Sequence, residues 1–201
     1  MEIMEKIIEI FEKNNGYSRM IDLKKAHIHT RTVANAVKDR IIEKVKPGLY
    51  KLIDFPWDEH NSFVDVYNSN KKAVICLLSA ASYYELTTFN PPEVYVAVPN
   101  NTDRFTLHYP PIKVFYFSDN NYEPGIETLE TKSGIVKIYN KEKTICDLFR
   151  YMNKLGEDVA VESLKEYLKN RKKMNISKLL EYSEICGVKK KMEPMIKAIL
   201  S

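Results

Sequence analysis

The order of patterns over the first 53 residues constrains the fold of this chain more than any other feature. Three short segments with helical apolar spacing come first, and two strand-like runs follow them. The runs, Ile41–Val45 and Leu49–Ile53, meet at Lys46-Pro47-Gly48, which is typical of a tight turn. We therefore predict the order helix, helix, helix, hairpin.

The three predicted helices cover residues 2–14, roughly 17–28, and Thr30 to about Arg40. Asn14-Asn15-Gly16 ends the first helix, and His29 or Thr30 is placed to cap the third. The side chains expected to face the core are Ile3, Ile7, Ile10 and Phe11, then Met20, Ile21 and Leu23, then Val33, Ala34 and Val37.

A boundary is expected at residues 54–60, DFPWDEH, which concentrate proline, tryptophan and acid without periodicity. Beyond it, residues 70–86 predict a buried helix, because apolar residues occur almost all round it. Strands are predicted at 91–99, 112–117, 125–131 and 134–139, the last two forming a hairpin, and helical spacing resumes from Asn140. The predicted fold is α+β: a winged helix-turn-helix domain over 1–54, followed over 60–201 by a mixed α/β domain with a helical C-terminal tail.

Composition restricts the function classes. No stretch has the roughly 18 to 20 consecutive apolar residues that a membrane span needs, and the N-terminus lacks the apolar core of a signal peptide, so we expect a cytoplasmic protein without membrane contacts. The three cysteines, Cys76, Cys146 and Cys186, lie far apart in apolar-periodic segments, which favours buried free thiols. Net charge is +4 over residues 1–51, −5 over 52–140 and +5 over 141–201, so both ends are basic.

The third predicted helix carries groups suited to reading DNA. Arg31 suits guanine, Asn35 one turn later suits adenine, and threonine hydroxyls bond bases or phosphates. A solvated amphipathic helix carries the same residue types, but their position before a basic hairpin favours DNA binding. The predicted contacts are Thr30, Arg31, Thr32, Asn35 and Lys38 on the helix, with Lys24, Lys25, Lys44 and Lys46 as phosphate-contacting lysines around it and Lys51 near the hairpin.

Other chemistry has weaker support. His27 and His29 are two residues apart and face away from each other on a helix, and His60 and His108 have no ligand-like partner at metal spacing. The six glycines form no phosphate loop. The alternative is a metal-dependent nuclease that a winged helix brings to DNA, with acids and a lysine near strands: Asp65, Glu93, Asp103, Glu127 and Lys137. A third class, a module that only mediates interactions, also fits basic faces that are merely solvated.

Two basic runs remain open to two interpretations. Residues 171–173 and 189–191 fit solvated corners at helix ends, and they also fit a second electrostatic surface.

Two stretches show the clearest resemblance to a known family. The first is LSAASYYEL followed by VYVAVP, and the second is VKIYNKEKTICDLFR. The segment KPGLYKL before them and the segments SLKEYLKN and NISKLLEYSEICG after them add to the resemblance. In the order of its segments and in their pattern of small, apolar and polar residues, nearly the whole chain resembles the AbiEi family of type IV antitoxins. Members of this family are also transcriptional regulators. The chain is shorter than many members.

The resemblance implies an autorepressor without cofactor or catalytic centre. It would bind inverted repeats upstream of its own operon through the N-terminal domain. Its C-terminal domain would counteract a nucleotidyltransferase-like toxin without forming a stable complex with it. The DNA-facing positions that match are Thr30, Arg31, Thr32, Asn35, Lys38 and Lys46, whereas Thr144, Asp147 and Arg150 are candidates only for structural roles in their helix.

Overall fold

The computed structural model describes residues 2–56, 59–171 and 174–200 and is a mixed α+β fold with helices at both ends. It divides into two compact units. The first unit comprises residues 1–71, 106–110 and 130–135, and the second comprises 72–105, 111–129 and 136–201. The first unit thus continues past the boundary expected at 54–60, of which Trp57 and Asp58 lie outside the described residues.

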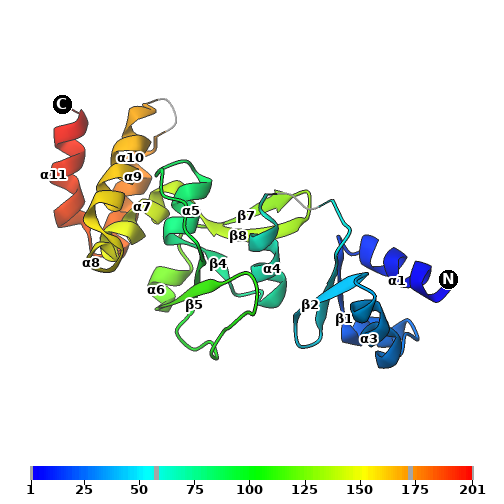
Figure 1. Cartoon of the computed structure of the whole chain (residues 1–201). Helices are drawn as coiled ribbons and strands as arrows, with labels where there is room; N and C mark the ends of the chain where they lie inside the picture. The colour runs from blue at the N-terminus through cyan, green and yellow to red at the C-terminus, as the bar shows by residue number, and fades with distance from the viewer. Residues whose placement is uncertain (1, 57–58, 172–173, 201) are drawn as a thin grey trace. The chain divides into compact units, whose positions relative to one another are not determined.

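The first unit has the predicted three helices and hairpin, with one additional strand and one additional helix (Figure 1). Its elements are α1 (Glu2–Glu12), β1 (Tyr17–Arg19), α2 (Met20–Lys25), α3 (Thr30–Lys38), β2 (Ile42–Lys46), β3 (Leu49–Leu52) and α4 (Asn61–Ser69). Strand β1 and helix α4 were not predicted. The second helix, predicted over roughly 17–28, is wrong in its first part, because residues 17–19 form β1 and the helix is limited to Met20–Lys25. His29 is the N-cap residue of α3, as expected, but its side chain makes no capping hydrogen bond.

The core of the first unit lies between the helices and one face of the sheet. It contains Ile7, Phe11, Leu23, Ile28, Val33, Ala36, Ile42 and Leu52. Three predicted core positions were wrong: Ile3 is 46% exposed, Ile21 is 60% exposed, and Ala34 is exposed. Ala36 is buried instead of Ala34 because it lies three residues after Val33, on the same face of α3.

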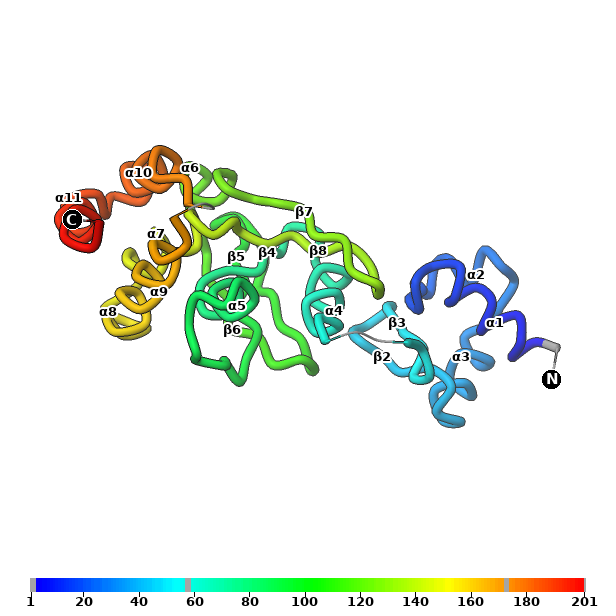
Figure 2. The backbone as a smooth tube through the Cα atoms, turned by 90° about the horizontal axis from the view of Figure 1, so that it is seen from above, coloured from blue at the N-terminus to red at the C-terminus, as the bar shows by residue number. Residues whose placement is uncertain are grey.

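The three strands form an antiparallel sheet in the order β1-β3-β2. Tyr17 pairs with Lys51 and Lys51 pairs with Glu43, which gives one row of polar side chains across all three strands. Helix α4 lies on the opposite side of the β2–β3 hairpin from α1, α2 and α3 (Figure 2). Both faces of the sheet are therefore covered by helices.

Two or three residues after the ends of α1, α2 and α3, the chain has a residue other than glycine with left-handed backbone conformation: Asn15 (φ 53°), His27 (φ 61°) and Arg40 (φ 56°). After α3, the amide of Arg40 donates to Val37 O and the amide of Ile41 donates to Ala36 O. This pair of bonds satisfies carbonyls at the helix end and turns the chain sharply into the next element.

The second unit combines a sheet with a group of C-terminal helices. Its elements are β4 (Val74–Ile75), α5 (Leu77–Tyr83), β5 (Val94–Pro99), β6 (Ile112–Phe117), α6 (Asp119–Tyr122), β7 (Ile126–Thr131), β8 (Gly134–Tyr139), α7 (Lys141–Arg150), α8 (Met152–Leu155), α9 (Glu157–Lys169), α10 (Ile176–Ile185) and α11 (Lys189–Leu200). The tip of the β7–β8 hairpin belongs to the first unit, where a Cβ at Gly134 would lie 3.2 Å from Val64 Cγ1.

The five strands are ordered β6-β5-β4-β8-β7, with β4 antiparallel to β5 and parallel to β8, and β5 parallel to β6. The four strands predicted over 91–139 are confirmed within a few residues. The single helix predicted over 70–86 is wrong in its first part, because Val74 and Ile75 pair with β5 and the helix begins at Leu77. The segment is buried from Ala73 to Ala81, as expected.

Helix α7 is the centre of the helical part of the second unit. Residues 142–149 are all buried, and α7 packs against α5, α9 and α10. Asn140 caps it by accepting a hydrogen bond from the amide of Lys143. The prediction of buried free thiols is confirmed for Cys76, Cys146 and Cys186. Within the described ranges, no helix is long and apolar enough to cross a membrane.

Candidate nucleic-acid interface

Helices α2 and α3 are joined by the turn Ala26–His29. His27 takes the left-handed conformation, its amide donates to Lys24 O, and the amide of Ile28 donates to Leu23 O. Ile28 is buried with 1% exposure. A short turn fixed in this way holds two helices at a defined angle, as the helix-turn-helix arrangement requires.

One face of α3 is open to solvent. Thr30, Arg31, Ala34, Asn35 and Lys38 are exposed, whereas Thr32 is partly buried. The exposed residues follow helical spacing and form one continuous stripe. We call this stripe the α3 face. Helix α3 has no acidic residue, so the stripe carries two cations, an amide, a hydroxyl and a methyl group.

The predicted lysines around α3 differ in their surroundings. Lys24 and Lys25 are exposed on α2, and Lys25 Nζ lies 3.9 Å from the carboxylate of Asp22. Lys44 is exposed on β2. These three ammonium groups are therefore accessible to an external anion.

Lys46 has a different environment. Its Nζ donates to the carbonyl of Ser69 at the end of α4. Burial lowers the pKa of Lys46, and the positive charge of Arg19 lowers it further. One of the predicted phosphate-contacting lysines is thus held in a bond within the first unit.

The polar row on the sheet meets a buried carboxylate from α4. Asp65 is 1% exposed; its Oδ2 lies 2.8 Å from Lys51 Nζ, and its Oδ1 accepts from the Tyr17 hydroxyl at 2.7 Å. Lys51 Nζ also lies 3.2 Å from the Glu43 carboxylate. Burial raises the pKa of Asp65, and the bonds from Lys51 and Tyr17 oppose that rise. This network attaches α4 to the hairpin.

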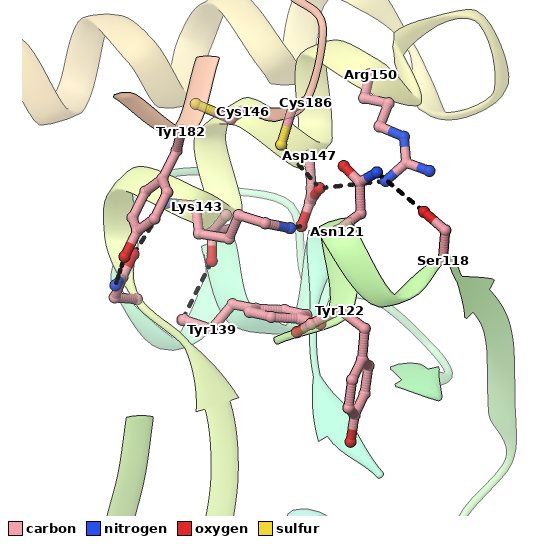
Figure 3. Close-up of polar contacts among 12 residues, drawn as sticks. Ser118, Asn121, Tyr122, Tyr139, Lys143, Cys146, Asp147, Arg150, Tyr182 and Cys186 are labelled. Atoms are coloured by element: carbon pink, nitrogen blue, oxygen red, sulfur yellow. Dashed lines mark hydrogen bonds and ion pairs between the residues drawn. The ribbon is translucent and has the colours of Figure 1, made fainter. Parts of the chain in front are cut away.

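The second unit has its own buried ion pair, shown in Figure 3. Lys143 Nζ lies 2.5 Å from Asp147 Oδ2 and 4.4 Å from the centre of the Tyr139 ring, and both charged side chains are fully buried. Burial raises the pKa of Asp147, against the effect of Lys143. Thr144 donates to Tyr139 O at 3.2 Å, and Arg150 Nη1 lies 3.9 Å from Asp147. The expected structural role of Thr144, Asp147 and Arg150 agrees with these contacts within the unit.

The five residues considered for a nuclease occupy separate surroundings. Asp65 is engaged by Lys51 and Tyr17, and Glu127 on β7 lies 3.8 Å from Lys178. Asp103 is exposed in a loop, Glu93 precedes β5, and Lys137 is on β8. In the part of the chain that the structure describes, no group of three His, Cys, Asp or Glu side chains is placed to hold a metal ion.

The two basic runs are only partly described. Lys172 and Lys173 lie outside the described residues. Lys189 at the start of α11 pairs with Glu184, and Lys191 Nζ lies 3.9 Å from the sulfur of Met152. At least one cation of the second run is therefore engaged by a carboxylate.

No family model matches the chain, and no curated protein matches it. The resemblance to type IV antitoxins therefore rests on the sequence stretches quoted above.

Proposed function

We propose that the chain is a DNA-binding transcriptional regulator whose first unit acts as a winged helix-turn-helix. The observation that carries the proposal is the α3 face: exposed Arg31 and Asn35 on a short helix that follows a fixed turn and precedes a two-stranded hairpin. In this assignment α3 is the recognition helix, and β2 and β3 form the wing.

The α3 face has the chemistry to read base edges in the major groove. Arg31 suits the two acceptors of guanine, and Asn35 suits the acceptor and donor of adenine. Ala34 lies between them and is exposed. Its small side chain allows the helix to approach the bases closely, and its methyl group suits the methyl of thymine.

Phosphate contacts in this proposal come from the exposed lysines Lys24, Lys25, Lys38 and Lys44. Thr30 at the start of α3 adds a hydroxyl, whereas Thr32 is partly buried and contributes less. Lys46 is assigned a smaller share, because its ammonium group already donates to Ser69 O.

The resemblance supports a more specific proposal. The chain would repress its own operon by binding inverted repeats, and it would oppose a nucleotidyltransferase-like toxin without a stable complex. Inverted repeats require two copies of the recognition helix, one on each half-site. We assign the antitoxin activity to the second unit as a whole.

The test is a binding titration of the full chain with a duplex from its own upstream region and with a random duplex of equal length. We expect preference for the upstream duplex without added metal, and a loss of about 1 to 3 kcal/mol for Arg31→Ala and for Asn35→Ala on that duplex. Lys165→Gln, at an exposed lysine on α9, is the control that changes charge elsewhere. Equal losses on both duplexes would contradict the assignment of Arg31 and Asn35, and no preference in the unaltered chain would contradict specific regulation.

The antitoxin part has a separate test. A nucleotidyltransferase-like reading frame beside the gene would be expressed with and without this chain. We expect growth to be restored by the chain and no stable complex on gel filtration. Failure to restore growth would contradict the antitoxin role while leaving the DNA-binding result intact.

A further inference from the structure

Three cations of the first unit gather at the C-terminal end of α4. Arg19 on β1 donates to Asn68 O at 3.3 Å, and Lys46 on β2 donates to Ser69 O. Lys71, just after α4, donates to Asn68 Oδ1 at 2.7 Å and lies 4.1 Å from the centre of the Tyr67 ring. The end of a helix carries partial negative charge, which explains why a cation lies there but does not balance three.

No carboxylate of the described ranges forms an ion pair with Arg19, Lys46 or Lys71. Their acceptors are two carbonyls and an amide oxygen. The pKa of Lys71, like that of Lys46, is lowered first by burial and then by the charge of Arg19. The three charges therefore repel one another, and an anion beside them would relieve that repulsion.

A cleft of about 410 Å³ opens at this cluster. Arg19, Lys71, Asn68 and Ser18 are among the residues that line it. Asp22 also lines the cleft, and its carboxylate lies 3.9 Å from Lys25 Nζ. The cleft thus gives an external anion access to Arg19 and Lys71.

We propose that this cleft binds a phosphate group through Arg19 and Lys71. A guanidinium group offers two parallel N–H donors to phosphate oxygens, and a lysine ammonium adds a point charge. Lys46 contributes its charge from the side of β2. The ligand is defined by its phosphate, which belongs either to a free phosphate compound or to the backbone of bound duplex DNA.

The cleft and the α3 face consist of different residues. Phosphate binding in the cleft and base reading by the α3 face can therefore be tested, and disproved, independently. The cleft involves β1 and the end of α4, whereas the α3 face involves Thr30 to Lys38. Only the DNA form of the proposal depends on the proposed function.

The first arm of the test titrates the ¹⁵N-labelled full chain with inorganic phosphate at constant ionic strength. We expect saturable shifts of the amide signals of Ser18, Arg19 and Lys71. The double variant Arg19→Gln/Lys71→Gln should lose at least tenfold in affinity, and Lys165→Gln should match the unaltered chain. The charge-preserving variant Arg19→Lys/Lys71→Arg should retain saturable binding, and this separates loss of charge from loss of fold.

The second arm measures the salt dependence of binding to the upstream duplex with the same variants. If the ligand is a DNA phosphate, the double variant lowers the slope of log K against log salt by about 1 to 2, whereas Lys165→Gln leaves it unchanged. Saturable phosphate binding with an unchanged slope supports a free phosphate compound. A double variant that behaves like the unaltered chain in both arms would overturn the proposal. If the unaltered chain binds no DNA, the proposed function is contradicted. The phosphate titration of the first arm then still shows whether the cleft binds phosphate.

Discussion

The ammonium group of Lys51 on β3 lies 2.8 Å from the carboxylate of Asp65 on α4, and the two residues are 5% and 1% exposed. Lys51 lies at the centre of a row that runs from Tyr17 on β1 to Glu43 on β2. The contact therefore joins the helix to all three strands of the sheet through one buried pair of charges. Removing one partner of such a pair leaves an uncompensated buried charge.

We predict that Lys51→Met and Asp65→Leu each lower the free energy of unfolding of the first unit by about 3 to 5 kcal/mol. The double variant Lys51→Met/Asp65→Leu should regain most of this loss, because neither charge then remains. Urea unfolding monitored by circular dichroism gives the coupling energy of the cycle. Additive losses would show that the two charges do not depend on each other.

A substitution at Ala34 that introduces repulsion tests the α3 face more sharply than the alanine variants of Arg31 and Asn35, which only remove a contact. Ala34→Glu places a carboxylate in the middle of the exposed stripe, where it would meet DNA phosphates, and glutamate is compatible with a helix. We expect at least a tenfold loss of affinity for the upstream duplex with unchanged thermal unfolding. Ser177→Glu, at an exposed position on α10, is the matched control. Unchanged binding by Ala34→Glu would exclude this face as the DNA contact.

Lys44 and Lys46 should differ in their contributions to binding although both are on β2. Lys44 is exposed, whereas the ammonium group of Lys46 donates to Ser69 O. We expect Lys44→Gln to lower the salt slope of DNA binding by about 1, and Lys46→Gln to lower it by less than half as much. Fluorescence anisotropy at several salt concentrations measures both slopes. A larger change for Lys46→Gln would reverse the assignment.

Arg40→Gly should stabilise the first unit. Arg40 has a φ of 56° directly after α3 and is exposed, so its side chain adds strain without packing in the core. Glycine adopts this conformation at little cost, and we expect a gain of about 0.5 to 1 kcal/mol in the free energy of unfolding after its larger unfolded-state entropy is included. Urea unfolding measures the change. Lys38→Gly, at the last helical residue of α3, should instead destabilise, and the same sign for both variants would contradict the explanation.

Glu162 on α9 should make the second unit sensitive to acid. Its carboxylate accepts hydrogen bonds from the Thr87 hydroxyl at 2.7 Å and from the amide and hydroxyl of Thr88 at 3.2 Å. The bond from Thr87 first, and those from Thr88, lower the pKa of Glu162 from its ordinary value of 4.5. A depressed carboxyl pKa stabilises the folded state above the unfolded pKa, and this contribution is lost as pH falls through the folded pKa.

The corresponding measurement compares the unaltered chain with Glu162→Gln by thermal unfolding from pH 7 to pH 3. We expect a difference of no more than about 1 kcal/mol at pH 7, because solvent screens this group. The difference should shrink below about pH 4.5, the ordinary glutamate value. A difference that grows as the pH falls would contradict the assigned sign.

Local patterns in the sequence were sufficient to predict three helices and the hairpin of the first unit and four strands of the second. They were insufficient wherever a partner distant in sequence decides the structure. Strand β1 has only three residues and exists because it pairs with β3 more than thirty residues later. Helix α4 buries Asp65 and Ser69, which look like surface residues until Lys51, Tyr17 and Lys46 are placed beside them.

The exposed face of α3 was predicted in outline but not in every residue. Alanine at 34 and at 36 gives little indication of which one is buried, and in a helix of nine residues one misplaced position shifts the predicted face. Nothing near Lys46 in the sequence indicates that its ammonium group reaches a carbonyl 23 residues away. The cations of the proposed phosphate cleft come from residues 19, 46 and 71, a spacing that no local motif describes.

The first unit is assembled from three separate stretches of chain, the last of which is residues 130–135. A ribosome adds about 5 to 20 residues per second, so the segment after residue 71 that completes this unit emerges seconds later than the rest. During that interval α4 and the hairpin are already synthesised, but the turn that places Gly134 against Val64 is not. The nascent chain must therefore finish its first unit while the β-strands of its second are being made.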